Sequence, residues 1–331
     1  MSNRAKLLIS VLFIAAIILT IGLTRFYFDV TKNTGGNPDD GKVEQILRSY
    51  GDLQVFRNPN GYCGVVNADG AVVIEPEWLE VLDVTEDLVL VSSRINDEVL
   101  VGGVDFEENV VLPFVYRSIQ EIGSGCYAAT VAADETVILY DSDYEMLLPD
   151  AYEAAAYDGN LLKVMNEGCS FYYDVTGDAP VMRRAELQAV IGEQKLIWRA
   201  ANQVYLSDLT EKDLLQMNRS IAAYTGMLLA DDFTELSGIS SGEYISGLTK
   251  PGSMPYAQID RISGFSLSKQ DTLTYDLAFT ASYHTSEIRD AAVQMHLMFR
   301  RGAERTMILT SANLDFQSAP QATAEQTADA E

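Results

Sequence analysis

The chain has 331 residues, with 48 acidic against 23 basic side chains and a formal net charge of −25. A surface this acidic repels nucleic acid and anionic lipid, so no nucleic-acid partner is expected. The acidity favours solubility, with attraction for cations or basic wall components as the alternative. Its three cysteines, Cys63, Cys126 and Cys169, contain no CxxC pair and are too few for a disulfide framework. We expect them to be small core residues, with one disulfide left open.

Residues 7–28 predict a transmembrane signal anchor. Leu7–Leu23 is almost entirely apolar, and a helix that crosses a membrane needs about 20 mostly apolar residues. Arg4 and Lys6 precede this run, so the positive-inside rule predicts a cytoplasmic tail over residues 1–6. A cleaved secretory signal peptide is the alternative. In both cases we expect the bulk of the chain outside the cytoplasm, and the anchor predicts a single-pass protein of the cell membrane.

A linker over residues 29–41 leads to a region of predicted strands. Lys42–Tyr50 predicts one short helix, and helical periodicity is then absent until about residue 183. A turn-forming Asn or Asp follows an apolar pair four times, at spacings of 38, 36 and 33 residues: Asn67, Asp105, Asp141 and Asp174. An aromatic residue shortly after a proline recurs at spacings of 38 and 36: Trp78, Tyr116 and Tyr152. Because two marks share one period, we expect hairpin units that stack on one another.

These units resemble the WG-repeat family of small β units. The matching positions are Gly64, Asn67, Gly70, Pro76 and Trp78, then Gly103, Asp105, Pro113 and Tyr116, then Asp141, Pro149 and Tyr152, and last Asp174 and Gly177. The signature Trp of the family is missing, and Cys63 stands at its place in the first unit. The resemblance covers about residues 52–181 and implies an all-β repeat array, propeller- or solenoid-like, with a binding or scaffold role and no shared chemistry. We place the repeat domain at residues 42–181.

Residues 182–317 predict a second domain that begins with helices. Apolar residues recur near helical spacing over 185–205, which predicts one helix. Thr210 stands three residues before Asp213, as in a capping box, and predicts a second helix over 211–229. One short helix is expected within the Gly- and Ser-rich stretch that follows, at residues 241–248.

Four strands complete this domain, at Ile259–Leu267, 272–284, 293–300 and Arg305–Phe316. The middle two alternate between apolar and polar side chains, which is typical of an antiparallel sheet with one wet face. Two helices and a four-stranded meander resemble the cystatin-like cone of the nuclear-transport-factor-like superfamily, which implies an α+β cone. Residues 318–331 predict a disordered acidic tail. The predicted fold class is therefore a membrane-anchored chain with an all-β repeat domain and an α+β cone.

Motifs that could carry chemistry are weak. Gly238–Gly242 matches GxSxG around Ser240, but a polar loop precedes it where a nucleophile elbow needs a buried strand. Gly123–Ala128 matches GxGxxA, but strand-like sequence follows where a dinucleotide site needs a helix. Asp141, Asp143 and Glu145 alternate and could offer oxygen ligands to calcium, but the glycine and the late glutamate of a helix-loop-helix calcium site are missing. No catalytic, cofactor or metal residue is predicted, and His284, His296 and Asp276 are candidates for a cone pocket.

The predicted function is a non-catalytic, extracytoplasmic binding or scaffold protein of a bacterial cell envelope, which recognises a protein, peptide or glycan. The alternative is a small-ligand-binding or hydrolytic cone displayed on a β-repeat stalk. A further alternative is an envelope assembly component that oligomerises through the cone domain. The interior of the cone separates the first two, because a packed core favours an interaction module and a deep pocket favours a ligand or a reaction.

Overall fold

The computed structural model describes residues 42–191, 194–200, 206, 208–249, 257–288, 291–302 and 306–317. Its contacts divide the chain into two compact units, Met1–Ala154 and Ala155–Glu331. The predicted cytoplasmic tail, anchor, linker and C-terminal tail lie outside the described residues. The predicted location outside the cytoplasm depends on the first two of these segments and is therefore not tested by the structure.

The expected fold class, a membrane-anchored chain with an α+β cone, is wrong. Within the part of the chain that the structure describes, no helix is long and apolar enough to cross a membrane. The described residues are dominated by strands, which form four antiparallel sheets. The fold is therefore β-rich in both units, and the described residues contain neither the expected membrane anchor nor a single-pass arrangement.

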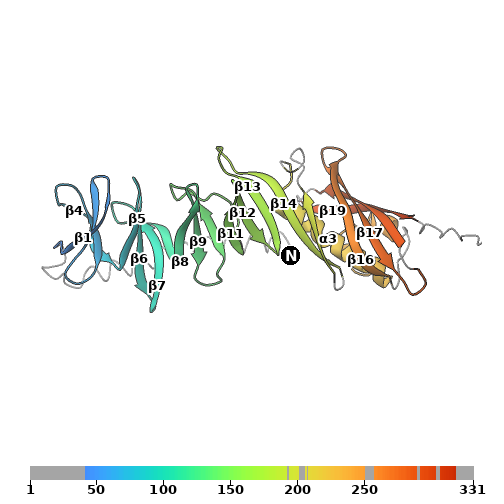
Figure 1. Cartoon of the computed structure of the whole chain (residues 1–331), viewed down its shortest axis with the longest axis horizontal. Coiled ribbons are helices and arrows are strands. Elements are labelled where there is room, and N and C mark those ends of the chain that lie inside the picture. The colour runs from blue at the N-terminus through green and yellow to red at the C-terminus, as the bar shows by residue number, and fades with distance from the viewer. Residues whose placement is uncertain are drawn as a thin grey trace, which may run out of the picture. The chain divides into compact units, whose positions relative to one another are not determined.

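The first unit is built from two antiparallel meanders, labelled along the blue-to-green part of the chain in Figure 1. One has the order β1-β2-β3-β4, with bounds β1 (Gln45–Tyr50), β2 (Leu53–Arg57), β3 (Cys63–Val66) and β4 (Val72–Trp78). The other has the order β10-β9-β8-β7-β6-β5, with bounds β5 (Glu80–Val84), β6 (Val89–Ile95), β7 (Glu98–Val104), β8 (Val110–Gly123), β9 (Cys126–Val131) and β10 (Val137–Tyr140).

The expected helix over Lys42–Tyr50 is wrong, because β1 occupies most of this segment. β1 pairs with β2 from Gln45 opposite Arg57 to Tyr50 opposite Leu53. Gly51 takes a left-handed φ of 58° in the tight turn between them, which glycine adopts without steric cost. The pairing of β1 with its neighbour therefore overrides the weak helical pattern of the isolated segment.

Three of the four predicted turns have the same five-residue loop. In each, the side-chain Oδ1 of the first residue accepts a hydrogen bond from the backbone N–H of the fifth, at 2.9 Å for Asn67, 2.7 Å for Asp105 and 2.9 Å for Asp141. The fourth loop residue is left-handed each time: Gly70, Glu108 and Tyr144, with φ of 77°, 62° and 58°. The shared period of the sequence thus corresponds to a shared loop geometry.

The fourth turn differs, and a further turn of the same kind was missed. Asp174 accepts hydrogen bonds from the N–H and the hydroxyl of Thr176 and pairs with Arg183. Asn58, between β2 and β3, has the same loop as the first three turns, because its Oδ1 accepts from the N–H of Tyr62 at 2.9 Å. Gly61 has the matching left-handed φ of 89°.

The aromatic residues that mark the repeats lie in cores shared between consecutive hairpin repeats of the first unit. Trp78 stacks on Phe114 of the next repeat, with ring centroids 5.6 Å apart and planes 3° from parallel. Tyr116 is buried, and its hydroxyl lies 2.6 Å from that of Tyr140. Tyr152 is also buried and bridges to Val137. Since one hairpin cannot bury its own apolar face, these contacts explain why the hairpin repeats follow one another along the chain.

The second unit contains two more antiparallel sheets, in the green-to-red part of Figure 1. The first has β11 (Ala154–Asp158), β12 (Leu161–Asn166), β13 (Cys169–Asp174), β14 (Val181–Ile191) and β15 (Gln194–Ala200) in sequence order. Next come helix α3 (Glu211–Ala230), the 3-10 helix η1 (Leu236–Gly238) and α4 (Ile245–Leu248). The second sheet has β16 (Gln258–Lys269), β17 (Thr274–His284), β18 (Ala291–Arg301) and β19 (Met307–Gln317) in sequence order.

The expected helix over 185–205 is wrong, because β14 and β15 cover most of it. Ala185, Leu187, Ala189 and Ile191 are buried at every second position, which is the period of a strand. β14 pairs with β13 on one side and β15 on the other. This sheet therefore spans the predicted domain boundary between residues 181 and 182.

The other predicted helix and the four late strands are confirmed. Thr210 caps α3 through the N–H of Asp213, and the Asp213 carboxylate accepts from the N–H of Thr210, which completes a capping box. α3 packs against β14 of the first sheet and β19 of the second. Trp198 of β15 stacks on Phe265 of β16, which stacks on Phe279 of β17. The core of this unit is thus shared by both sheets and the helix.

Candidate binding groove

A groove in the first unit lies where the sheet β1–β4 meets β5. It has a volume of about 210 Å³ and is lined by Leu47, Arg48, Val55, Arg57, Cys63, Glu80, Val81 and Leu82. Val55 and Arg57 are two residues apart on β2, so they point to the same face of the sheet. Arg57 pairs with Cys63 on β3, which brings that buried cysteine to the groove floor.

Arg48 is held at the rim of the groove by polar contacts. Its Nη1 donates a hydrogen bond to the carbonyl of Leu82 at 3.2 Å, and the Tyr50 hydroxyl donates to the same carbonyl at 3.3 Å. The interaction with the Tyr50 hydroxyl, followed by the charges of Glu80 and Asp83, raises the pKa of the Arg48 guanidinium. Arg48 is therefore oriented and cationic at every physiological pH.

Arg57 is the less satisfied of the two arginines. Its Nε atom is buried and makes no hydrogen bond. Within the described residues its side chain has no ion pair. A buried donor of a charged group normally has a partner, because its loss of hydration is otherwise uncompensated. Arg57 is thus a cationic group of the groove with capacity for an anionic partner.

A polar and aromatic network extends from the rim of the groove. Asp83 accepts a hydrogen bond from the Tyr144 hydroxyl at 2.9 Å, and the ring of Tyr144 packs against Tyr127 with centroids 4.9 Å apart. Burial, and then the negative charge of Asp83, raise the pKa of the Tyr144 hydroxyl. This tyrosine therefore stays protonated and donates to Asp83.

The residues that define the repeats have structural places. Asn67, Gly70, Asp105 and Asp141 form the hairpin loops, and Trp78, Tyr116, Tyr152, Gly103 and Pro76 are buried. Pro113 is half-buried in β8, Pro149 and Gly177 are exposed in loops, and Asp174 is bound to Thr176 and Arg183. None of these side chains lines the groove.

Gly64 has the sharpest steric requirement among these positions. A Cβ atom there would lie 2.5 Å from the carbonyl oxygen of Ile74. Gly102, three residues before Asp105 as Gly64 is before Asn67, would place a Cβ 2.9 Å from the carbonyl oxygen of Leu112. Gly102 is thus the structural counterpart of Gly64, a correspondence that the sequence match had given to Gly103.

The histidines considered for a cone pocket lie on the polar face of the second sheet of the second unit. His296 Nδ1 is 3.2 Å from Asp276 Oδ2, and His284 Nδ1 is 2.8 Å from Asp260 Oδ1. The opposite face carries the fully buried Leu277 and Leu297. The two histidines therefore do not share a site, and neither points with the apolar residues into the core.

Ser240 of the GxSxG match also has a structural contact. Its hydroxyl donates a hydrogen bond to the carbonyl of Leu309 at 2.7 Å, and the N–H of Leu309 donates to the carbonyl of Ile239 at 3.0 Å. These two bonds tie the loop after η1 to β19. Among the described residues no group of three His, Cys, Asp or Glu side chains could hold a metal ion.

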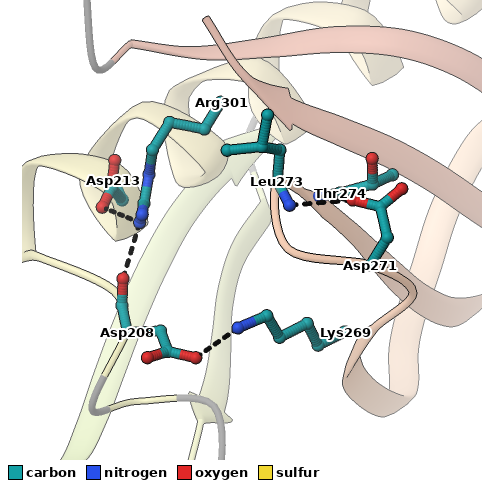
Figure 2. Close-up of polar contacts among 7 residues, drawn as sticks. All are labelled: Asp208, Asp213, Lys269, Asp271, Leu273, Thr274 and Arg301. Carbon is teal, nitrogen blue, oxygen red and sulfur yellow. Dashed lines mark hydrogen bonds and ion pairs between the residues drawn. The ribbon is translucent and has the colours of Figure 1, made fainter.

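A polar cluster at the start of α3 fastens the helix to the second sheet (Figure 2). Arg301 Nη2 donates to Asp213 Oδ2 at 2.8 Å and to the carbonyl of Asp208 at 2.6 Å, and Lys269 forms an ion pair with the Asp208 carboxylate. Asp271 caps the nearby turn by accepting from the N–H groups of Leu273 and Thr274 at 2.8 and 2.9 Å, as Figure 2 shows.

The same helical turn is also bound to the first sheet of its unit. The Tyr173 hydroxyl, on β13, donates to Glu211 Oε1 at 2.5 Å. Glu211 and Asp213 are both buried, so each acid is matched by a donor from a different sheet. We interpret this cluster as a structural junction.

No protein-family model and no curated protein matches this sequence. The resemblances to WG repeats and to a cystatin-like cone stay predictions.

The groove is a feature that the sequence analysis missed, although the sequence contains a signal for it. Residues 42–154 hold five basic side chains against 22 acidic ones, and two of the five, Arg48 and Arg57, lie on adjacent strands of one hairpin.

Proposed function

We propose that this chain is a non-catalytic binding or scaffold protein, in which degenerate WG-like repeats form a frame for a partner-binding groove. The partner is a protein, peptide or glycan. An extracytoplasmic place of action in a bacterial cell envelope is part of the proposal. The observation that carries it is the groove, which holds two of the few basic side chains of an acidic unit.

The places of the other candidate residues support a binding role over a hydrolytic one. The Ser240 hydroxyl donates a hydrogen bond to a backbone carbonyl, and no histidine contacts Ser240 among the described residues. A nucleophilic serine needs a base within hydrogen-bond reach. The side chains that mark the repeats are used in turns and cores, and none of them lines the groove.

Site-specific photo-crosslinking in cells tests this function. A benzophenone amino acid replaces Leu47, which is 36% exposed at the groove, or Val190, which is 52% exposed on β14 of the second unit. We expect discrete protein or glycan adducts from position 47 and a different, weaker pattern from position 190. Absence of any adduct specific to position 47 would contradict a binding role for the groove.

A further inference from the structure

The geometry points to a specific ligand for the groove: the carboxylate side chain of an extended acidic peptide, which lies along the free edge of β1 and reaches Arg48 and Arg57. This inference rests on the proposed binding function and adds the chemical class of the partner.

The two arginines of the groove outnumber its single acid, Glu80, so the local charge favours an anion. Arg57 lines the groove and has no ion pair among the described residues, and Arg48 has one guanidinium nitrogen fixed on the Leu82 carbonyl while others remain for a ligand. The acids that face the arginines are Glu80, which lines the groove, and Asp83, which is occupied by Tyr144. Because a guanidinium binds a carboxylate through paired N–H donors, a carboxylate is the natural match for the remaining donors.

The size of the groove favours a side chain over a free small molecule. Pockets for small-molecule ligands usually have volumes of about 300–1,000 Å³. The groove has a volume of about 210 Å³ and is partly apolar, through Leu47, Val55 and Val81. A Glu or Asp side chain fits this space, with its methylene groups against the apolar lining and its carboxylate at the arginines.

The strand next to the groove can receive a polypeptide. β1 is at the edge of its sheet, so its outer backbone groups have no strand partner among the described residues. Ile46 and Leu47 of β1 are 42% and 36% exposed. Exposed, apolar edge strands are templates for strand addition, which proteins normally cover or charge. A peptide strand paired with β1 would alternate its side chains, and one set would face the groove.

A peptide array tests the inference with the full chain. The array carries seven-residue peptides with Glu, Asp, Gln, Asn or Lys at the central position and varied flanking residues. We expect the strongest spots to have a central Glu or Asp. For the best peptides, fluorescence anisotropy should show at least a tenfold weaker Kd after a central Glu is replaced by Gln.

Charge-matched variants locate the effect. The double variant R48Q/R57Q should weaken binding of the acidic peptide at least tenfold, whereas R94Q/R117Q, which removes the same charge elsewhere in the unit, should leave it within about twofold. Arg57→Lys keeps the charge without the paired donors and should lose less than the double variant. The emission of Trp78, in the core beside the groove, checks that each variant is folded.

The inference is overturned by no peptide binding on the array, by no preference for a central acid, or by equal losses in the two double variants. Displacement of the peptide by free acetate or succinate at concentrations near the Kd of the peptide would also overturn it, because the ligand would then be a small carboxylate. If crosslinking from position 47 still captures a partner, only the ligand class fails. If it captures none, the proposed function fails as well.

Discussion

Trp78 lies flat against Phe114, and these two residues belong to consecutive hairpin units. Both are buried in one apolar cluster that also includes Cys63, Ile74 and Val104. The stack therefore joins two consecutive hairpin repeats, and the first of them relies on the second to bury its aromatic residue. The two tryptophans of the chain, Trp78 and Trp198, lie in different compact units, so the fluorescence of each one reports on the unfolding of its own unit.

Phe114→Ala should lower the free energy of unfolding of the first unit by about 3–5 kcal/mol, since it removes a buried aromatic ring and leaves a cavity. Urea unfolding followed by Trp78 emission in a Trp198→Phe background measures this. Phe114→Leu is the control and should cost less, because it keeps most of the apolar volume. Equal losses for Ala and Leu would mean that the stack with Trp78, and not the filled volume, dominates.

Gly64→Ala should destabilise the first unit by roughly 1–3 kcal/mol, because its Cβ must displace backbone atoms of Ile74 and Pro76. Gly70→Asn is the matched control in the same repeat. Position 70 has open space around it and a left-handed φ, which Asn tolerates, so the change should be small. Thermal unfolding monitored by Trp78 emission compares the two, and a Gly64→Ala variant as stable as Gly70→Asn would contradict the close approach.

Arg301→Gln should destabilise the second unit by roughly 3 kcal/mol, because the Asp213 carboxylate is only 3% exposed and loses its ionic partner. Lys269→Gln removes the neighbouring, more exposed ion pair with Asp208 and should have little effect. Chemical unfolding read by Trp198 emission in a Trp78→Phe background tests both. A larger loss for Lys269→Gln than for Arg301→Gln would show that the cluster is held from the Asp208 side.

Asp174 should titrate well below an ordinary aspartate. Hydrogen bonds from the Thr176 hydroxyl, its N–H and Arg183, in that order, lower the pKa of Asp174 from 3.8 to about 2. A lowered pKa in the folded state means that the contribution to stability is complete above about pH 4 and is lost as the pH falls toward 2. Thr176→Val should raise this pKa more than Arg183→Gln does, as measured by carboxyl NMR titration, and the reverse order would contradict the assignment of causes.

Local interactions explain what could be predicted from the sequence. The loops at Asn67, Asp105 and Asp141 close through bonds between a side chain and backbone within five residues, so residue type and spacing predicted them. The same holds for α3, whose capping box joins Thr210 and Asp213. The alternation along β17 and β18 likewise reports one buried face, and the strands follow from it.

Long-range contacts decided the rest. The segment 185–200 has apolar residues at both helical and strand spacing, and only pairing with β13 makes it β-structure. The counterpart of Gly64 is Gly102 because of the backbone opposite it, which no linear match contains. The groove exists because Arg48 and Arg57 meet Glu80 and Leu82 across two sheets, and the fastening of α3 depends on Arg301, 88 residues beyond Asp213. Hydrogen bonds within one turn join neighbouring residues, so the local sequence is enough to predict them. Packing between distant strands depends on residues far apart in the sequence, so only the tertiary structure shows it.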